Sequence, residues 1–194
     1  MEMTAERALR AVPTHPSDAD LVGAARAGEL WAQEALYRHN VGAVFGLVRR
    51  LLGSEEDVDD VVQDTFILAF RALGSLREPG ALRSWMLRIA VGRVSRVIRK
   101  RRVLAGLGLR AREAPPDVDA MLGPSATPDV ALELARVYDF VVRLDADLRI
   151  AFVLRRIEGS TLEEIVELTG ASLATVKRRV ARAEAALEAW EGKR

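Results

Sequence analysis

Five residues near the C-terminal end of the chain have the chemistry of nucleic-acid contact. They share one stripe of a helix, or its flank, when successive residues are placed about 100° apart. These residues are Thr175, Arg178, Arg179, Arg182 and, on the flank, Lys177. Arginine and lysine bind phosphates, and arginine also binds base edges in the major groove. Because many helices carry a solvated cationic face, the stripe alone leaves that simpler interpretation open.

Two helices joined by a tight turn are predicted to position this stripe. Ser160 and Glu163 form a capping box that starts the first helix, and Gly170 ends it. Ser172 caps a longer second helix, whose apolar residues recur every three or four positions. This arrangement is typical of a helix-turn-helix, in which the second helix enters the major groove of DNA. The caps, the turn and the basic face together favour DNA binding.

Two oppositely charged blocks lie earlier in the chain. Every charged residue from Arg83 to Arg112 is basic, and every charged residue from Ser54 to Asp64 is acidic. Within the basic block, one predicted helix stripe suits a phosphate backbone. That stripe consists of Arg88, Ser95, Arg99 and Arg102. Blocks of opposite sign indicate two surfaces for two different partners.

The sequence shows no pattern of residues typical of a metal site, a cofactor site or an enzyme active site. The acidic block has several carboxylates but no His or Cys beside them, so we predict no metal site and no cofactor. The chain also lacks a nucleophile, base and orienting group at catalytic spacing, so we predict no enzyme activity. With no cysteine, it has no disulfide or thiol chemistry of its own.

Composition predicts an all-α protein, and the helical patterns along the chain predict two small helical domains. The 194 residues are 49% hydrophobic, 29% charged and only 5% aromatic. No stretch has the length of a membrane span, and residues 1–16 lack the pattern of a signal peptide, so we expect a cytoplasmic protein without direct membrane insertion. The predicted parts are a disordered arm at 1–16, a helical domain at 17–102, a flexible linker at 103–127 and the helix-turn-helix domain at 128–194.

Local signals place the remaining helix ends. Ser17 is expected to cap the first helix, and Gly28 to break it. A long helix over 29–52 has a possible break near Asn40 to Gly42 and ends at Gly53. Ser54 should open the third helix, which ends near Gly74. The remaining helices are expected over 81–102, 128–142 and 147–157.

Two separated stretches resemble one family. EEDVDDVVQDTFILAFRAL, followed by PGALRSWMLRIA and the basic tail to Arg102, resembles the second conserved region of bacterial sigma-70 factors of the extracytoplasmic-function (ECF) group. LRIAFVLRRIEGSTLEEIVELTGASLATVKRRVARAEAAL resembles their fourth region. The resemblance implies a sigma factor that binds core RNA polymerase and directs promoter recognition and transcription initiation.

The resemblance also implies a role for each charged surface. The acidic segment would bind core polymerase through Asp57, Asp60, Gln63, Asp64 and Phe66. The predicted helix-turn-helix would read the upstream promoter element in duplex form through Ser172, Thr175, Lys177, Arg178, Arg179 and Arg182. The loop 74–80 and the basic helix would hold the downstream element and its melted non-template strand, through Leu76, Arg77, Arg88, Gly92, Arg96, Arg99 and Arg102. Trp85 is expected to pack in the core.

This sequence departs from the family pattern at two positions of the basic helix. Gly92 and Arg96 stand where relatives usually carry Asn and Asp, so opening of the downstream element is either impaired or altered. Two alternatives therefore stay open: a helix-turn-helix regulator independent of core polymerase, and a sigma-like adaptor deficient in promoter opening. The resemblance further implies an anti-sigma factor as a partner.

Overall fold

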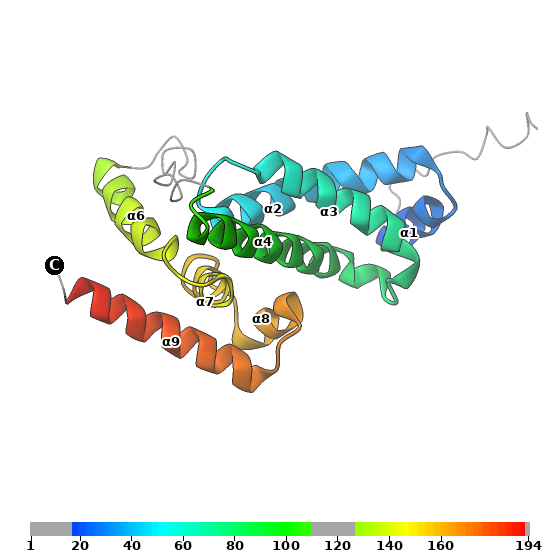
Figure 1. The fold of residues 1–194 in the computed structure, drawn as a ribbon. Helices are drawn as coiled ribbons and strands as arrows, with labels where there is room; N and C mark the ends of the chain where they lie inside the picture. Colours follow the sequence, from blue (N-terminus) through cyan, green and yellow to red (C-terminus); the bar gives the residue numbers. More distant parts are fainter. Residues whose placement is uncertain (1–16, 110–126, 193–194) are drawn as a thin grey trace, which may run out of the picture.

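The computed structural model describes residues 17–109 and 127–192, and this part of the chain consists of helices joined by short turns, without strands. The helices follow one another along the sequence as Figure 1 shows. They are α1 (Asp18–Arg26), α2 (Leu30–Leu52), α3 (Val58–Ala72), α4 (Leu82–Gly106), α6 (Pro128–Val141), α7 (Ala146–Phe152), α8 (Leu162–Thr169) and α9 (Leu173–Glu191). The all-α prediction is confirmed. The predicted N-terminal arm and most of the predicted linker lie outside the described residues.

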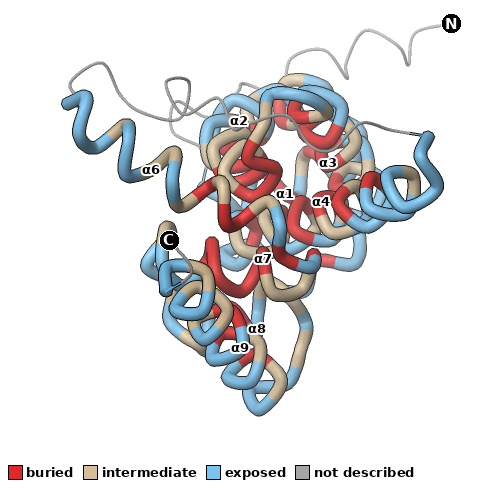
Figure 2. Tube along the Cα trace, turned by 60° about the vertical axis from the view of Figure 1, so that its left-hand side comes forward, coloured by how far each residue is buried: buried red, intermediate tan, exposed pale blue. Residues whose placement is uncertain are grey.

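Helices α1 to α4 form the first packed unit. α2 packs against α1, α3 and α4, and α3 also packs against α4. Their facing sides supply a continuous apolar core, seen as the buried stretches of α2, α3 and α4 in Figure 2. Leu21, Leu36, Leu51 and Met86 are among its completely buried side chains. Burial of these faces supplies the main driving force for this unit to fold.

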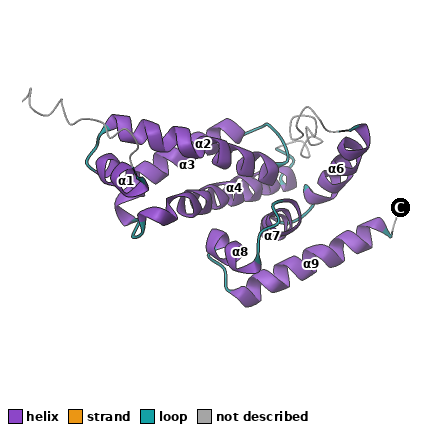
Figure 3. Ribbon diagram, turned by 180° about the vertical axis from the view of Figure 1, so that it is seen from behind, coloured by secondary structure: helices purple, strands orange, loops and turns teal. Residues whose placement is uncertain are grey.

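Helices α7, α8 and α9 form a second unit, which packs against the first. α7 and α8 both contact α9, and both also contact α4. Figures 1 and 3 show α7 and α8 between α4 and the long α9. Ile165, Val176 and Ala183 are buried where these helices meet. The second half of the chain therefore packs directly against α4.

Several predicted helix ends are confirmed. Ser17 makes a capping box with Asp20, in which the carboxylate accepts from the Ser17 backbone N–H at 3.0 Å. These hydrogen bonds hold the pKa of Asp20 below its usual range. Gly53 and Gly170 end α2 and α8 in the left-handed conformation, with φ of 64° and 68°. Ser172 caps α9 by accepting from the backbone N–H of Thr175 at 3.2 Å.

Predictions about the first three helices need correction. α2 is continuous through 40–42, and the buried Asn40 side chain donates to the Leu36 carbonyl at 2.9 Å. α3 begins at Val58 instead of Ser54, because the chain first turns through Asp57 at a φ of 65°. It ends at Ala72, and a 3-10 turn carries the chain past Gly74.

Three further boundaries differ from prediction. The capping box of α8 uses Thr161 and Glu164, one residue later than predicted, with the Thr161 backbone N–H donating to Glu164 at 2.7 Å. α4 continues to Gly106, so the first residues of the predicted linker are helical. The helix predicted over 147–157 is α7 followed by a π-helical turn at Val153–Ile157.

Candidate nucleic-acid interface and acidic partner surface

Three of the predicted DNA-reading residues lie on the exposed side of α9, away from its apolar seam. Val176, Val180 and Ala183 are buried and fix the orientation of the helix. Lys177, Arg178 and Arg182 are consequently exposed, and none of them forms an ion pair within the described residues. These three side chains are free to contact phosphates or base edges.

Three other members of the predicted α9 set are less free. Arg179 is half-buried and binds Asp147 of α7, with 2.7 Å between Nη2 and Oδ2. Ser172 is occupied as the helix cap, and its hydroxyl also donates to the Thr175 hydroxyl at 3.0 Å. Thr175 is half-buried. Their contact with DNA therefore remains a prediction.

The basic face of α4 divides into two regions. Nearer the start of the helix, Arg88, Gly92 and Arg96 line a pocket of about 340 Å³ between α3 and α4. Trp85 and Ile89 contribute the apolar wall of this pocket. Trp85 is half-buried and packs against the core, as predicted, but it also lines this pocket. A cationic pocket with an aromatic wall suits a nucleotide.

The second region of α4 faces the C-terminal half of the chain. Arg99 and Arg102 lie near the C-terminal end of α4, where they pair with Asp147 and Asp145. They line a cleft together with Thr175, Arg178, Arg179 and Arg182 of α9. The structure therefore brings together two basic faces that are about 80 positions apart in sequence.

The prediction for the loop 74–80 needs one correction. Leu76 is only 5% exposed, because its side chain belongs to the core. Its backbone carbonyl, like that of Leu73, accepts a hydrogen bond from the Arg26 guanidinium. Leu76 therefore cannot contact a base in this conformation, whereas Arg77 beside it is exposed.

The acidic segment presents a smaller free surface than the sequence indicated. Asp57 binds the guanidinium of the buried Arg101, with Oδ2 at 2.9 Å from Nε and 2.6 Å from Nη2. Asp64 pairs with Arg93. Asp60 and Gln63 remain exposed. Two of the predicted polymerase contacts are thus engaged within the protein, and two are available to a partner.

An apolar groove adjoins Gln63, and its acidic lining residue is Asp59, the residue before Asp60. The groove lies between α2 and α3 and has a volume of about 550 Å³. Phe66, one of the predicted contacts, is 4% exposed and forms part of its wall, with its ring centroid 4.7 Å from that of Tyr37. Tyr37 and Ile67 are partly exposed at the same groove. Sequence analysis missed Tyr37, because it lies on α2, far from the acidic segment.

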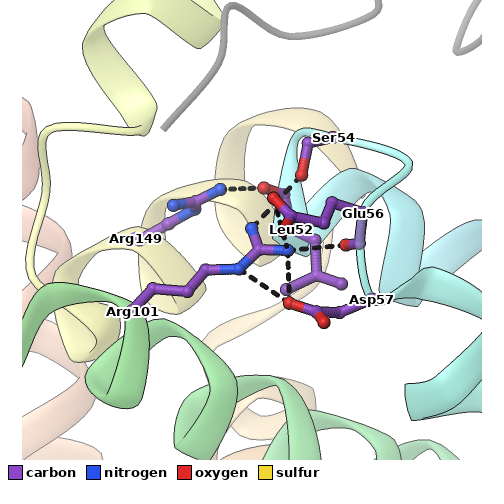
Figure 4. Close-up of polar contacts among 6 residues, drawn as sticks. All are labelled: Leu52, Ser54, Glu56, Asp57, Arg101 and Arg149. Carbon is purple, nitrogen blue, oxygen red and sulfur yellow. Dashed lines mark hydrogen bonds and ion pairs between the residues drawn. The ribbon is translucent and has the colours of Figure 1, made fainter. Parts of the chain in front are cut away.

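Sequence analysis also missed a polar contact that joins the two halves of the chain. The completely buried Arg149 of α7 donates from Nε to the Leu51 carbonyl at 2.9 Å and from Nη2 to the Leu52 carbonyl. Arg101 of α4 binds the adjacent turn at Ser54, Glu56 and Asp57, so Figure 4 shows two guanidiniums on one segment. Arg149 satisfies carbonyls at the C-terminus of α2 that lack helical partners, and Arg101 holds the turn that follows the helix.

Tyr138 and Glu158 complete this contact. The buried Tyr138 hydroxyl donates to the Arg50 carbonyl at 3.0 Å, and burial raises the pKa of Tyr138 to about 12. Glu158 binds the Arg50 guanidinium through both carboxylate oxygens, one of them at 3.0 Å. We call Arg50, Gly53, Tyr138, Arg149 and Glu158 the clasp, because they hold the C-terminus of α2 to the second half of the chain.

Two absences hold for the described residues. No group of three or more His, Cys, Asp or Glu side chains in 17–109 and 127–192 is placed to hold a metal ion. Within the same ranges, no helix has the length and apolar character needed to cross a membrane.

Comparison with known proteins decides the family. The sigma-70 region 2 pattern matches residues 36–103, and the sigma-70 region 4 pattern matches residues 134–187. Over 192 residues the chain is 33% identical to RNA polymerase sigma factor CnrH of Cupriavidus metallidurans, covering 90% of this chain and 95% of the relative. This chain belongs to the sigma-70 family. It is a sigma factor of the ECF group.

Other relatives agree with this assignment. The ECF RNA polymerase sigma-E factor of Haemophilus influenzae is 33% identical over 178 residues, which cover 89% of this chain and 94% of that sigma factor. The solved structure of CnrH in complex with the cytosolic domain of CnrY has a TM-score of 0.58 and 29% identity, and covers 92% of this chain and 99% of that one. RpoE of Bartonella quintana, solved with the anti-sigma factor NepR, shows the same fold, with a TM-score of 0.62. The two chains are 22% identical, and the match covers 80% of this chain and 93% of that chain.

The family assignment gives the function in outline. Sigma factors bind core RNA polymerase and direct it to promoters, and this sigma factor does the same. A free-standing regulator and an adaptor deficient in promoter opening, the two alternatives that the sequence left open, are not favoured. Members of the family are non-catalytic initiation factors.

Proposed function

We propose that this sigma factor divides initiation among three surfaces. Asp60 and Gln63, together with the groove between α2 and α3, bind core polymerase. The pocket between α3 and α4 and the exposed Arg77 hold the melted non-template strand, and the free face of α9 reads the upstream element. The observation that carries this division is the separation of the acidic groove from the basic pocket by α3, which lines both.

The chemistry of the acidic groove supports polymerase binding. Exposed carboxylate and amide groups beside a partly exposed aromatic wall suit a partner helix that offers both basic and apolar side chains. Asp57 and Asp64 shape this surface from within by anchoring Arg101 and Arg93. We therefore assign direct contact to Asp60 and Gln63, with Tyr37 and Phe66 as the apolar floor.

The basic pocket supports strand binding. Unstacking a base costs a few kcal/mol, which stacking and phosphate contacts must offset. Trp85 and Ile89 offer an apolar face, while Arg88 and Arg96 offer charge. Gly92 leaves the pocket wider than the asparagine typical of relatives would, so we propose that opening is altered and not lost.

Further proposals concern partners, domains and location. We propose that the chain works as two domains, 17–102 and 128–194, joined by the segment 103–127, and that it catalyses no reaction itself. Because CnrH was solved with the cytosolic domain of CnrY, we propose that an anti-sigma factor also binds this chain. We place its action in the cytoplasm, where it would meet RNA polymerase and DNA.

A binding measurement tests the polymerase surface. Substitution of Asp60→Asn with Gln63→Ala should weaken binding to purified core polymerase on the order of tenfold, as expected for charged and polar groups at an interface. Fluorescence anisotropy of the labelled full chain gives this affinity. Glu34→Gln is the matched control, because Glu34 is an exposed acid on α2 whose one ion pair within the described residues is with Arg38. Equal affinities for the double variant and the control would contradict the assignment.

A further inference from the structure

The last turn of α1 carries an arginine that binds a distant segment of the chain. Arg26 reaches the connection between α3 and α4, where its Nε donates to the Leu73 carbonyl at 3.2 Å and its Nη2 donates to the Leu76 carbonyl. These acceptors lie 47 and 50 positions later in the sequence. Among the described residues, Arg26 has no carboxylate partner, so its hydrogen bonds there serve this connection alone.

The packing of α1 fixes where this guanidinium lies. Leu21 and Val22 are completely buried against the core of the first unit. α1 also contacts both short turns of the connection, Leu73–Ser75 and Pro79–Ala81, and Figures 1 and 3 show the helix beside them. Because α1 is held by the core, the hydrogen bonds from Arg26 tie the connection to a rigid part of the molecule.

The loop 74–80 is anchored at its centre and exposed on both sides of the anchor. Leu76 is 5% exposed, with its side chain in the core and its carbonyl bound by Arg26. The residues just before and just after it are exposed. The other hydrogen bonds of this loop among the described residues are local, such as that from the Ala81 backbone N–H to the Glu78 carbonyl at 3.0 Å. Arg26 is therefore the side chain that ties the loop backbone to another helix.

Capture of a flipped base benefits from a loop that is anchored in advance. Unstacking a base costs free energy, and a loop that also had to become ordered on binding would add to that cost. A loop already held in one conformation avoids the second cost and presents the same pocket to every base, so bases that fit poorly are rejected. Arg77 follows Leu76 directly, so the same anchor sets the backbone position of Arg77.

Arginine suits this role better than other polar side chains. Its planar guanidinium presents donors in a fixed fork, so it can bind two carbonyls at once, and a charged donor binds a carbonyl more strongly than a neutral one. Lysine has the same charge on a single flexible ammonium group, and glutamine has amide donors without charge. Substitution by each of them therefore separates positioning by hydrogen bonds from a direct effect of charge.

We propose that Arg26 is a positioning residue for the loop 74–80, and that it sets the base preference of the downstream promoter element without touching the DNA itself. The proposal rests on the assignment of this loop and Arg77 to the melted strand under the proposed function. It extends the determinants of promoter choice to α1, a helix for which the sequence indicated no partner.

The base preference of the holoenzyme tests this role. The full chain is assembled with purified core polymerase and given partly double-stranded DNA whose single-stranded non-template segment is randomised, and the bound DNA is sequenced. Arg26→Gln and Arg26→Lys should both lower the enrichment of the preferred base about three-fold to ten-fold, since neither side chain can span both carbonyls as a guanidinium does. Arg77→Ala, in the same loop, should change the preference at the same positions.

Two controls separate positioning from loss of charge and from general destabilisation. Arg71→Gln removes an equal charge from an exposed position of α3 and should leave the base preference unchanged. Hydrogen exchange of the free protein provides a measurement without DNA: the backbone amides of 74–81 should exchange faster in both Arg26 variants, while those of α2 and α4 keep their wild-type rates. Faster exchange throughout the first unit would instead assign Arg26 to overall stability and contradict the proposal.

Three binding results would also overturn the proposal. An unchanged preference in both Arg26 variants, with a changed preference in Arg77→Ala, would refute positioning by Arg26 and leave the loop assignment intact. Weaker binding of all sequences with Arg26→Gln, restored by Arg26→Lys, would show that Arg26 contacts a phosphate directly. An unchanged preference in Arg77→Ala and in both Arg26 variants would show that the loop assignment under the proposed function is itself wrong.

Discussion

At the scale of single residues, Tyr138 and Arg149 show how strongly a few buried polar groups can join distant segments. Both side chains are completely buried, and both donate to carbonyls at the C-terminus of α2. A buried donor without an acceptor costs roughly 1–3 kcal/mol. These two groups therefore favour the one packing arrangement of the two halves in which both hydrogen bonds form. Gly53 lies between them: a Cβ there would come within 3.1 Å of both side chains.

Tyr138 should make the stability of the folded protein sensitive to alkaline pH. Its folded pKa, about 12, is raised above the ordinary value of 10.0, so the folded state binds the proton more tightly than the unfolded state does. Its contribution is therefore complete below pH 10 and is lost as the pH rises towards 12. Tyr138→Phe should lower the free energy of unfolding by about 1 kcal/mol at neutral pH, where the hydrogen bond to Arg50 is lost.

Urea unfolding at a series of pH values checks this prediction. The difference between wild type and Tyr138→Phe should shrink or reverse above pH 10, because phenylalanine has no proton to release. The comparison of the two proteins cancels the titration of other groups. Parallel stability curves at all pH values would refute the assigned role of the Tyr138 hydroxyl.

At the scale of secondary structure elements, local signals predicted most helices but not all of their ends. Four helix caps lie where the sequence predicted them, because a cap depends on only a few neighbouring residues. They are Ser17, Gly53, Gly170 and Ser172. The α8 cap was misplaced by one residue because Ser160 and Thr161 both precede a glutamate at the required spacing.

Other errors have causes distant in sequence. α3 starts late because Arg101, more than 40 residues away, binds the turn at Ser54 to Asp57. The same contact removes Asp57 from the predicted polymerase surface. The positions of Leu76 and Tyr37, and the whole clasp, likewise depend on tertiary packing, which periodicity and capping rules do not encode.

Two glycines should respond in opposite ways to alanine. Gly92 lies within α4 with open space around its Cα, so Gly92→Ala should raise the free energy of unfolding by about 0.5–1 kcal/mol. Gly170 has a φ of 68°, and a Cβ there would lie 2.9 Å from the Arg88 guanidinium, so Gly170→Ala should be destabilising. Thermal and chemical unfolding measure both changes. Destabilisation by Gly92→Ala would show that α4 needs the glycine for a structural reason.

The exposed arginines of α9 should determine sequence preference. Arg178→Ala or Arg182→Ala should reduce affinity for the upstream element by about 1–3 kcal/mol and relax the preference at the contacted base pairs. Selection of bound duplexes from a randomised pool measures the preference of each variant in the assembled holoenzyme. Weaker binding with an unchanged preference would assign these arginines to phosphates instead of base edges.

At the scale of the whole molecule, the fold places the three proposed binding surfaces on two helical units that pack against each other. The first unit carries the acidic groove and the basic pocket, and the second carries the reading helix. When one unit binds promoter DNA, it raises the effective concentration of the other unit at the same promoter. Two contacts of modest affinity can therefore give selective promoter binding.

Run-off transcription tests the central claim most directly. Purified core polymerase is combined with the full chain on DNA from upstream of its own coding sequence. We predict initiation at a defined start site. Initiation should be reduced at limiting sigma factor with Asp60→Asn plus Gln63→Ala, and promoter choice should shift with Arg178→Ala. A chain that binds core polymerase but never supports initiation at a defined site would contradict the account.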